Sequence, residues 1–329
     1  MTSATEIDEI DAEILKNLIM DARKKFTKIA REAHVTKDVI WQHYAKMKKE
    51  GVIVGATIQL NYAALGYDVA ASFFISTAPQ EQQRTIEQLR KIRGLYDAYP
   101  WGSYSLIWAV SDLMKAEQID NVKQLIKKIP SVLKVEVEVW TGMRRMPENL
   151  SVLGNTKISS SPQKTQTQTE NRNEKTTGEI DDIDMQIIEQ LGVNARASFN
   201  NIAKKLGIST STVARRYDKL KCNGIIRAII QINPEKIGYP RSAWLRLAIG
   251  SKGDLDSIAE RIAKIPDVVG ILKTTGIYDL TLNTRIKSLE HLTTLETEIA
   301  KISGIREMAP AMLNQFPVMP YPREHMSTF

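Results

Sequence analysis

Apolar residues recur at helical spacing near the start of the chain and again past its middle. Steps of three and four residues separate them in both places, which predicts an amphipathic helix at each (Ile10, Ile14, Leu15 and Leu18; Ile183, Ile187, Ile188 and Leu191). The first of these helices begins in a cluster of acidic side chains (Glu6, Asp8, Glu9 and Asp11). Carboxylates stabilise the positive end of a helix dipole, so we interpret the cluster as helix capping and not as an acid/base pair.

A tight turn is predicted after a second, short helix in each half of the chain. The short helices cover residues 26–33 and 199–206, and longer helices follow at 37–50 and 210–223. Gly207 allows the left-handed conformation that such a turn needs, and Ser209 can cap the helix that follows. His34 stands where Gly207 stands, and histidine is enriched at positive φ, so we expect the same turn with slight strain. Three short helices with a tight turn before the last predict a helix-turn-helix in each half.

After each predicted group of three helices, the sequence continues with apolar runs typical of strands that alternate with amphipathic helices. The order strand, helix, strand, strand, helix, strand is predicted twice, at 69–76, 80–92, 96–100, 106–110, 115–128 and 132–140, and at 243–249, 255–265, 268–273, 278–285, 288–302 and 305–313. This order predicts a ferredoxin-like antiparallel sheet with both helices on one face. The other face needs cover, to which Phe73, Trp108 and Trp140 can contribute, so we expect the sheets to pair within or between chains.

The two halves of the chain also match each other residue by residue. With the second half shifted by 173 residues, 16 of the 47 positions from Ile7 to Ile53 are identical. We therefore expect a tandem duplication of α+β class, in which a winged-type three-helix helix-turn-helix domain precedes a ferredoxin-like βαββαβ domain in each copy. The expected boundaries are 1–60 and 179–233 for the helical domains, 64–150 and 236–322 for the sheet domains, and 151–178 for a polar linker.

The segment between the two copies is almost free of apolar side chains. Residues 155–177 contain a single one, Ile158. Such a segment cannot bury enough surface to offset the entropy lost on ordering, so we expect it to be flexible. At about 5.5 Å times the square root of its length, its root-mean-square reach is roughly 26 Å.

Composition narrows the class of protein. Among 329 residues, 45 Lys and Arg against 38 Asp and Glu give a net charge of +7, which suggests a polyanionic partner without naming one. The one cysteine, Cys222, excludes an intrachain disulfide and a multi-cysteine zinc site. We find no uncharged apolar run near the roughly 18 residues of a membrane span, and the acidic N-terminus lacks the features of a signal peptide. We expect a soluble cytoplasmic, nucleoid-associated protein with no membrane partner.

The third helix of each helical domain carries the charge that suggests a partner. In both copies four basic side chains stand against one acidic side chain, and the apolar residues fall on one face. Small hydroxyls and basic groups are left facing outward, as a helix needs when its N-terminal end enters the major groove. A solvated basic face is the alternative, but the three-helix context favours double-stranded DNA. The expected DNA-binding residues are Thr36, Lys37, Trp41, Gln42, Lys46, Ser209, Thr210, Ser211, Thr212, Arg215, Arg216 and Lys219.

Five short motifs together resemble the Lrp/AsnC family of bacterial and archaeal feast/famine transcriptional regulators. They are strongest in the second copy: Ile180-Asp181-Asp182-Ile183-Asp184, Ala195-Arg196-Ala197-Ser198-Phe199, Leu206 to Val213, Gly224-Ile225-Ile226 and Thr275-Gly276-Ile277-Tyr278-Asp279. The resemblance implies a sequence-specific DNA-binding regulator whose sheet domain self-associates and senses a small effector, commonly an amino acid. The first copy departs from the pattern, with Lys25, Thr36, Val39, His43 and Ser105 in place of Ser198, Ser209, Thr212, Arg216 and Asp279.

The effector site that the resemblance implies lies near the loop from Thr275 to Asp279. A carboxylate such as Asp279 can accept hydrogen bonds from an α-ammonium group, and backbone N–H groups at Gly276 can donate to a carboxylate. Asp279 is equally well explained as a residue that hydrogen-bonds a hairpin turn, and Ser105 puts the ammonium contact of the first copy in doubt. The expected effector-binding residues are Thr275, Gly276, Tyr278, Asp279, Gly102 and Tyr104.

Three further functions compete with that of a specific regulator. Some proteins that resemble this family decarboxylate tetrapyrroles with the help of histidines, but of the four histidines here only His291 falls in a sheet domain. No cysteine/histidine cluster, nucleophile–base pair or phosphate loop is recognisable, so we expect no enzymatic activity, no metal and no cofactor. The second competing function is that of an architectural DNA-binding protein with weak specificity. The third is that of an effector sensor whose first copy has lost DNA contact.

Overall fold

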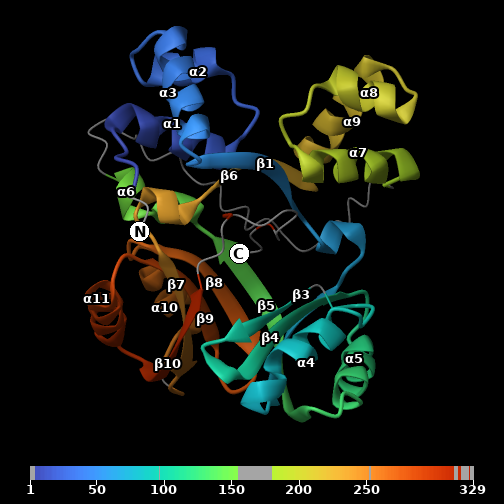
Figure 1. The fold of residues 1–329 in the computed structure, drawn as a ribbon, viewed down its shortest axis with the longest axis vertical. Helices are drawn as coiled ribbons and strands as arrows, with labels where there is room; N and C mark the ends of the chain where they lie inside the picture. Colours follow the sequence, from blue (N-terminus) through green and yellow to red (C-terminus); the bar gives the residue numbers. More distant parts are fainter. Residues whose placement is uncertain are drawn as a thin grey trace.

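The computed structural model describes residues 4–95, 97–154, 180–251, 253–314, 318–319 and 326. It contains α-helices, 3-10 helices and two antiparallel sheets (Figure 1). Residues 155–178 of the predicted linker lie outside the described residues. No helix within the described ranges combines the length and the apolar character that crossing a membrane requires.

Two groups of three helices lie at one end of the molecule (Figure 1). The first helical unit contains α1 (Glu9–Met20), α2 (Phe26–Glu32) and α3 (Lys37–Lys49), and the second contains α7 (Asp182–Val193), α8 (Phe199–Leu206) and α9 (Thr210–Cys222). The acidic residues at the starts of α1 and α7 form capping boxes, as the sequence predicts. The turns before α3 and α9 also have the expected geometry, with φ of 55° at His34 and 67° at Gly207.

A two-stranded antiparallel ladder joins the helical units. Strand β1 (Ile53–Leu60) follows α3, strand β6 (Ile226–Ile232) follows α9, and the two strands pair with each other along most of their length. Helix α1 packs on β6 and α7 packs on β1, so each unit rests on the strand of the other. Apolar residues of both units consequently share one core, which includes Ile14, Leu18, Ile187 and Leu191. Burial of this shared core holds the units together.

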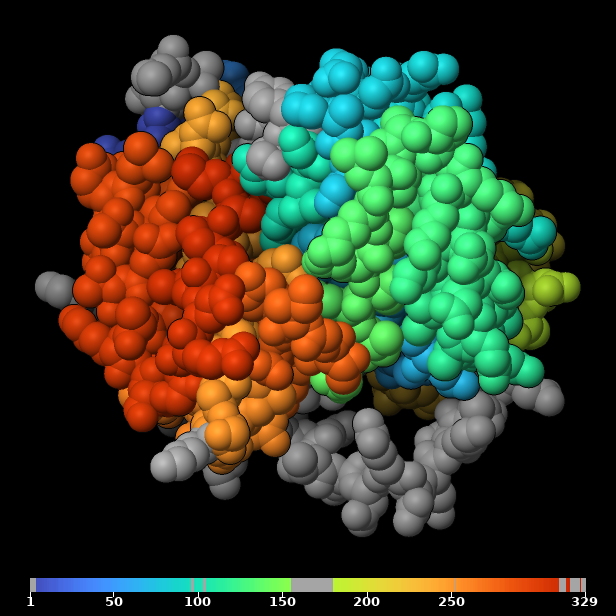
Figure 2. Space-filling model, turned by 90° about the horizontal axis from the view of Figure 1, so that it is seen from below, coloured from blue at the N-terminus to red at the C-terminus, as the bar shows by residue number. Residues whose placement is uncertain are grey.

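An eight-stranded antiparallel sheet occupies the other end of the molecule, in the order β10-β7-β9-β8-β5-β2-β4-β3. Each half has the predicted ferredoxin-like order, and β5 and β8 join the halves. Helices α4 and α5 cover the first half and α10 and α11 the second (Figure 1), and Figure 2 shows the two halves meeting along a seam. The bounds are β2 (Val69–Thr77), β3 (Asp97–Trp101), β4 (Ser103–Leu113), β5 (Val132–Arg145), β7 (Arg241–Ile249), β8 (Val268–Thr275), β9 (Leu280–Ile286), β10 (Ile305–Asn314), α4 (Gln82–Leu89), α5 (Gln118–Lys127), α10 (Leu255–Ile262) and α11 (Leu289–Ala300).

The face of the sheet away from the helices buries an aromatic cluster drawn from both halves. Trp101 and Trp108 of the first half contact Trp244 of the second, with ring centroids 5.5 and 5.0 Å from that of Trp244. The sheets therefore pair within one chain here. The expectation that Phe73 covers this face is wrong: Phe73 packs under the helices, and its neighbour Phe74 lies in the aromatic cluster. Successive side chains of a strand point to opposite faces, so a one-residue error changes the face.

The described part of the chain also contains short helical elements, and one of them falls in the predicted linker. Residues 151–154 form helix α6 (Ser151–Gly154), whose Leu153 is buried in the core shared by the helical units. The apolar pair Val152 and Leu153 explains why residues 151–154, assigned to the linker from the sequence, form a packed helix instead. The 3-10 helices are η1 (Ala63–Leu65), η2 (Pro79–Glu81), η3 (Pro147–Asn149) and η4 (Pro234–Ile237).

Candidate nucleic-acid interface and effector loop

Helix α9 presents hydroxyl groups at its start and basic groups along its exposed face. The Ser209 hydroxyl accepts a hydrogen bond from the Thr212 backbone N–H at 3.0 Å, which caps the helix. Val213, Tyr217 and Leu220 are buried beneath it. Of the residues predicted to bind DNA on this helix, Ser209, Thr210, Ser211, Arg215 and Lys219 are exposed and Thr212 is half-buried. The outward face therefore has the composition that contact with a groove requires.

Helix α3 presents a different set of side chains in the corresponding place. Thr36 caps it by accepting from the Val39 N–H at 3.3 Å. Trp41 is 56 % exposed although its ring lies beside Phe26 at a centroid distance of 6.0 Å. The predicted DNA-binding residues of this helix, which are Thr36, Lys37, Trp41, Gln42 and Lys46, are all exposed. Bulky and amide side chains thus stand where α9 carries small and guanidinium side chains.

Two of the predicted DNA-binding residues make ion pairs with acidic residues at the start of a helix. Lys46 Nζ lies 3.6 Å from Asp11 Oδ2, and Arg216 is the more buried of the two. Its Nη1 donates to both carboxylate oxygens of Asp181 at 2.7 Å and to Asp184 Oδ1 at 2.8 Å. The side chain of Arg216 is 18 % exposed, and that of Asp184 is 1 % exposed. Hydrogen bonds from Arg216 are the main reason why the pKa of Asp181 is lowered. The geometry makes Arg216 a brace between α9 and the start of α7.

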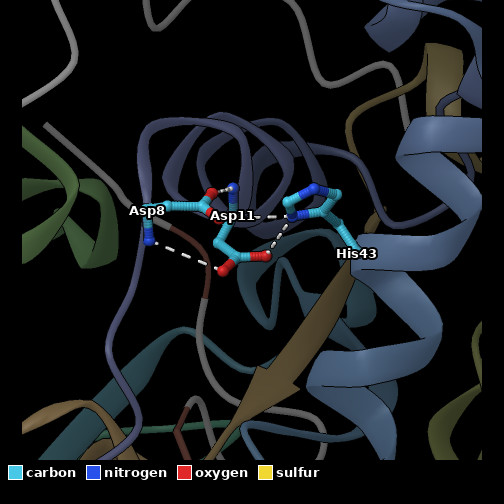
Figure 3. Close-up of side chains that lie close together, drawn as sticks. All are labelled: Asp8, Asp11 and His43. Carbon is cyan, nitrogen blue, oxygen red and sulfur yellow. Dashed lines mark hydrogen bonds and ion pairs between the residues drawn. The ribbon is translucent and has the colours of Figure 1, made fainter.

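His43 of α3 occupies the position that corresponds to Arg216. Its Nδ1 lies 2.9 Å from Asp11 Oδ1 and 3.6 Å from Asp8 Oδ2, as Figure 3 shows. These three side chains are of metal-ligating types, and their nearest ligand atoms lie within 4.8 Å of one another. The Asp residues already form the capping box of α1. Arg216 contacts the two Asp residues that match Asp8 and Asp11. We therefore interpret His43 as the residue that replaces Arg216 and links α3 to the start of α1, and not as a metal ligand.

The end of β8 and the loop that leads to β9 hold four of the predicted effector residues. Thr275 and Gly276 are exposed, and Tyr278 and Asp279 are half-buried. Asp279 Oδ2 accepts from the Ile249 backbone N–H at 2.7 Å, and the Asp279 backbone pairs with Leu247 and Thr274. Asp279 thus ties the loop to β7 through its carboxylate, and only its backbone carbonyl, which accepts from Thr274, closes the hairpin between β8 and β9.

The turn between β3 and β4, which corresponds to the loop between β8 and β9, lies against β10 of the second half of the sheet. A side chain added at Gly102, where φ is 63°, would meet Ala311 of β10 at 3.2 Å, so glycine permits this close approach. The side chain of Tyr104 lies outside the described residues. The predicted effector residues are therefore divided between two hairpins of the eight-stranded sheet, β3–β4 and β8–β9.

A buried ion pair lies next to the effector loop, and the sequence pattern did not predict it. Arg246 of β7 donates to Glu138 of β5, and its guanidinium lies between the rings of Phe74 and Tyr278, 4.0 and 4.2 Å from their centroids. Tyr278 in turn donates to Glu307 at 3.1 Å. Burial raises the pKa of Glu138, and Arg246 opposes this shift. The signal in the sequence is Arg246 itself, which interrupts the apolar run of residues 243–249.

Two family models match the second half of the chain. Residues 180–221 match the AsnC-type helix-turn-helix domain, and residues 243–310 match the Lrp/AsnC ligand binding domain. The chain is 31% identical over 129 residues to the HTH-type transcriptional regulator FL11 of Pyrococcus furiosus, which covers 39% of this chain and 85% of that protein. The chain belongs to the Lrp/AsnC family. A second relative in this family, the regulatory protein AsnC of Escherichia coli, is 30% identical over 142 residues, covering 43% of this chain and 93% of AsnC.

The expectation that the chain is not an enzyme needs correction. The crystal structure of the siroheme decarboxylase NirDL matches 98% of this chain and 94% of its own with a TM-score of 0.61. At 14% identity the likeness shows the fold alone. Because an enzyme has this full-length fold, the fold and the family give no ground for excluding catalysis.

Proposed function

We propose that this chain is a sequence-specific, DNA-binding transcription regulator that carries two helix-turn-helix units in one polypeptide. In this proposal the first and second helical units arose by tandem duplication, and α3 and α9 are their recognition helices. The observation that carries the proposal is the ladder between β1 and β6, which directly follows these two helices and holds both units on one core. A single chain then acts as the pseudo-dimer that two half-sites require.

The two recognition helices differ, so the expected operator is asymmetric. Genome-wide mapping of bound sites tests this directly, because it reports site symmetry and target genes together. We expect two unlike half-sites about one helical turn apart, and perfect inverted repeats alone would argue that like units of two chains pair on DNA. Equal affinity for a mapped promoter and for random duplex at physiological salt would instead support an architectural DNA-binding protein.

We expect Arg215→Ala to weaken specific binding more than Gln42→Ala. A guanidinium can make a bidentate contact to guanine worth about 1–3 kcal/mol of discrimination, and Arg215 is exposed without an ion-pair or hydrogen-bond partner among the described residues. Gln42 would favour adenine in the other half-site. The measurement is a binding titration with a mapped site, with the exposed Lys301→Ala as control. Equal losses for both variants would refute this ranking.

We also propose that a small effector such as an amino acid binds at the loop of Thr275, Gly276, Tyr278 and Asp279, and at the matching loop of Gly102 and Tyr104. The position of Gly276 supports the first part, since it is an exposed residue directly after β8, and a backbone N–H presented there would suit a carboxylate. The link from Tyr278 through Arg246 to Glu138 supports an effect of the ligand on the contact between the two halves of the sheet. Thermal unfolding with each of the standard amino acids added in turn tests for stabilisation by a ligand.

Catalysis on a tetrapyrrole is the second candidate function, and the full-length likeness to NirDL favours it. His291 lies near the buried Asp267, with Nε2 to Oδ2 at 3.4 Å, so an imidazole and a carboxylate are present in the second sheet domain. Adding haem or sirohaem and recording the Soret band tests this candidate. An unchanged absorption spectrum would reject it.

A further inference from the structure

Each helical unit extends one arginine into the other unit. Arg23, in the turn after α1, donates from Nη1 to the backbone carbonyls of Ala195 at 2.6 Å and Ala197 at 3.0 Å. Arg196, in the turn after α7, donates to the carbonyl of Ala22. The two residues correspond at the offset of 173, so the contact is reciprocal.

Aromatic rings of the opposite unit receive each guanidinium. The Arg23 guanidinium carbon lies 4.2 Å from the ring centroid of Phe199 and 5.3 Å from that of Tyr217. Tyr217 belongs to the buried face of α9, so Arg23 of the first unit touches the proposed recognition helix of the second. The Arg196 guanidinium carbon lies 5.0 Å from the ring centroid of Phe26 and 5.2 Å from that of Tyr44 of α3. Each arginine thus combines hydrogen bonds with cation–π contacts.

Burying two arginines at this contact costs free energy, which apolar side chains in the same positions would not. Both arginines are half-buried, and burial lowers the pKa of Arg23, with the nearby Arg196 guanidinium acting in the same direction. Two like charges lie close together where apolar side chains could pack without repulsion. The hydrogen bonds of a planar guanidinium group, however, fix the relative orientation of the two helical units as well as the distance between them.

We propose that Arg23 and Arg196 form a crossed pair of positioning residues that sets the spacing and relative orientation of recognition helices α3 and α9. This inference rests on the proposed function and deepens it, since it identifies the residues that define the spacing of half-sites. Strands β1 and β6 join the units, and the crossed arginines prevent each unit from pivoting about that two-stranded ladder. Rigid placement lowers the entropy lost when both helices bind one duplex.

Double electron–electron resonance tests the crossed pair without DNA. Cys222, the one cysteine, is exposed at the end of α9, and Lys49 is the corresponding position at the end of α3. Spin labels on Cys222 and on Lys49→Cys report the distance between the helices. We expect a narrow distance distribution in the labelled chain with both arginines present. We expect a broader one when Arg23→Lys and Arg196→Lys are added, because lysine keeps the charge and loses the planar guanidinium. The control is Arg31→Lys, on exposed Arg31 of α2. An unchanged distribution in the double lysine variant would overturn the proposal.

A duplex selected by the parent chain from a random library provides the second measurement. Inserting about five base pairs, half of a helical repeat, between its half-sites should weaken parent binding by roughly tenfold or more. In the double lysine variant we expect weaker binding to the selected duplex and a penalty for insertion within about twofold, with single half-site binding unchanged. A full insertion penalty in the variant would refute the crossed pair and leave the proposed function intact. Failure of the parent chain to select any duplex would refute the proposed function, while the spin-label distances would still decide the role of the arginines.

Discussion

Arg246→Met is expected to lower the free energy of unfolding by about 3–5 kcal/mol, because it leaves Glu138 charged and buried without a partner. Glu138 is 2 % exposed, and Arg246 is the residue that pairs with it across the contact between the two halves of the sheet. Arg246 also fills the space between the rings of Phe74 and Tyr278. Methionine keeps a flexible apolar stem and loses the charge together with the contacts of the guanidinium to both rings, so a second variant is needed to isolate the ion pair. Urea unfolding at neutral pH measures the loss.

The dependence of this loss on pH identifies Glu138 as its cause. Burial already raises the pKa of Glu138 above its ordinary value, and removing Arg246 raises that pKa further. A carboxyl whose pKa is raised by folding destabilises the fold once pH exceeds its unfolded pKa, about 4.3. The penalty grows until pH passes the folded pKa. The variant should therefore unfold most easily near neutral pH and recover stability toward acid.

Two further variants separate the ion pair from other effects. Glu138→Gln combined with Arg246→Met removes both charges, and we expect it to recover more than half of the stability lost by the single change. Arg241→Met, on the exposed residue at the start of β7, is the matched control and should have little effect. If the double variant were no more stable than Arg246→Met, a buried charge on Glu138 would not be the cause.

Local parts of this fold could be predicted from the sequence because short-range chemistry determines them. The acidic starts of α1 and α7 form capping boxes, in which side chain and backbone are three residues apart. The turn before α3 could be predicted at His34 from its match to Gly207, and its φ of 55° agrees. Alternating apolar runs likewise predicted the order of strands and helices in both halves of the sheet, because the period of the pattern is local.

Contacts between the two helical units, and between the two halves of the sheet, could not be predicted because nothing local encodes them. Arg23 donates to a carbonyl 172 residues away, and the same dipeptide Ala22-Arg23 would occur in any single-copy unit. Arg216 was predicted to bind DNA from its place on α9, whereas its direction toward Asp181 depends on how α7 crosses α9. The pairing of Glu138 with Arg246 similarly depends on β5 and β8 joining, which sequence left open between one chain and two.

Duplex binding is expected to fall by about 10³-fold or more between 50 and 200 mM salt, if both helical units contact DNA together. A protein that neutralises about six to ten phosphates shows such a loss, because each contact releases condensed counterions. One helix-turn-helix alone would contact fewer phosphates. The binding constant, measured at several salt concentrations, gives the slope of log K against log salt, and a slope typical of about three contacts would contradict joint binding.

Single lysine variants test which charges contribute to this slope. Lys219 is exposed on α9 without an ion-pair partner among the described residues, whereas Lys221 makes an ion pair with Asp21 at 2.9 Å. We expect Lys219→Ala to reduce the magnitude of the slope by about 0.9 and Lys221→Ala to reduce it by less, because Asp21 already balances the charge of Lys221. Lys301→Ala, at the end of α11 on the sheet side of the molecule, should leave the slope unchanged. Equal slopes for all four proteins would mean that DNA does not approach α9. The basic face of α9 would then serve solubility rather than recognition.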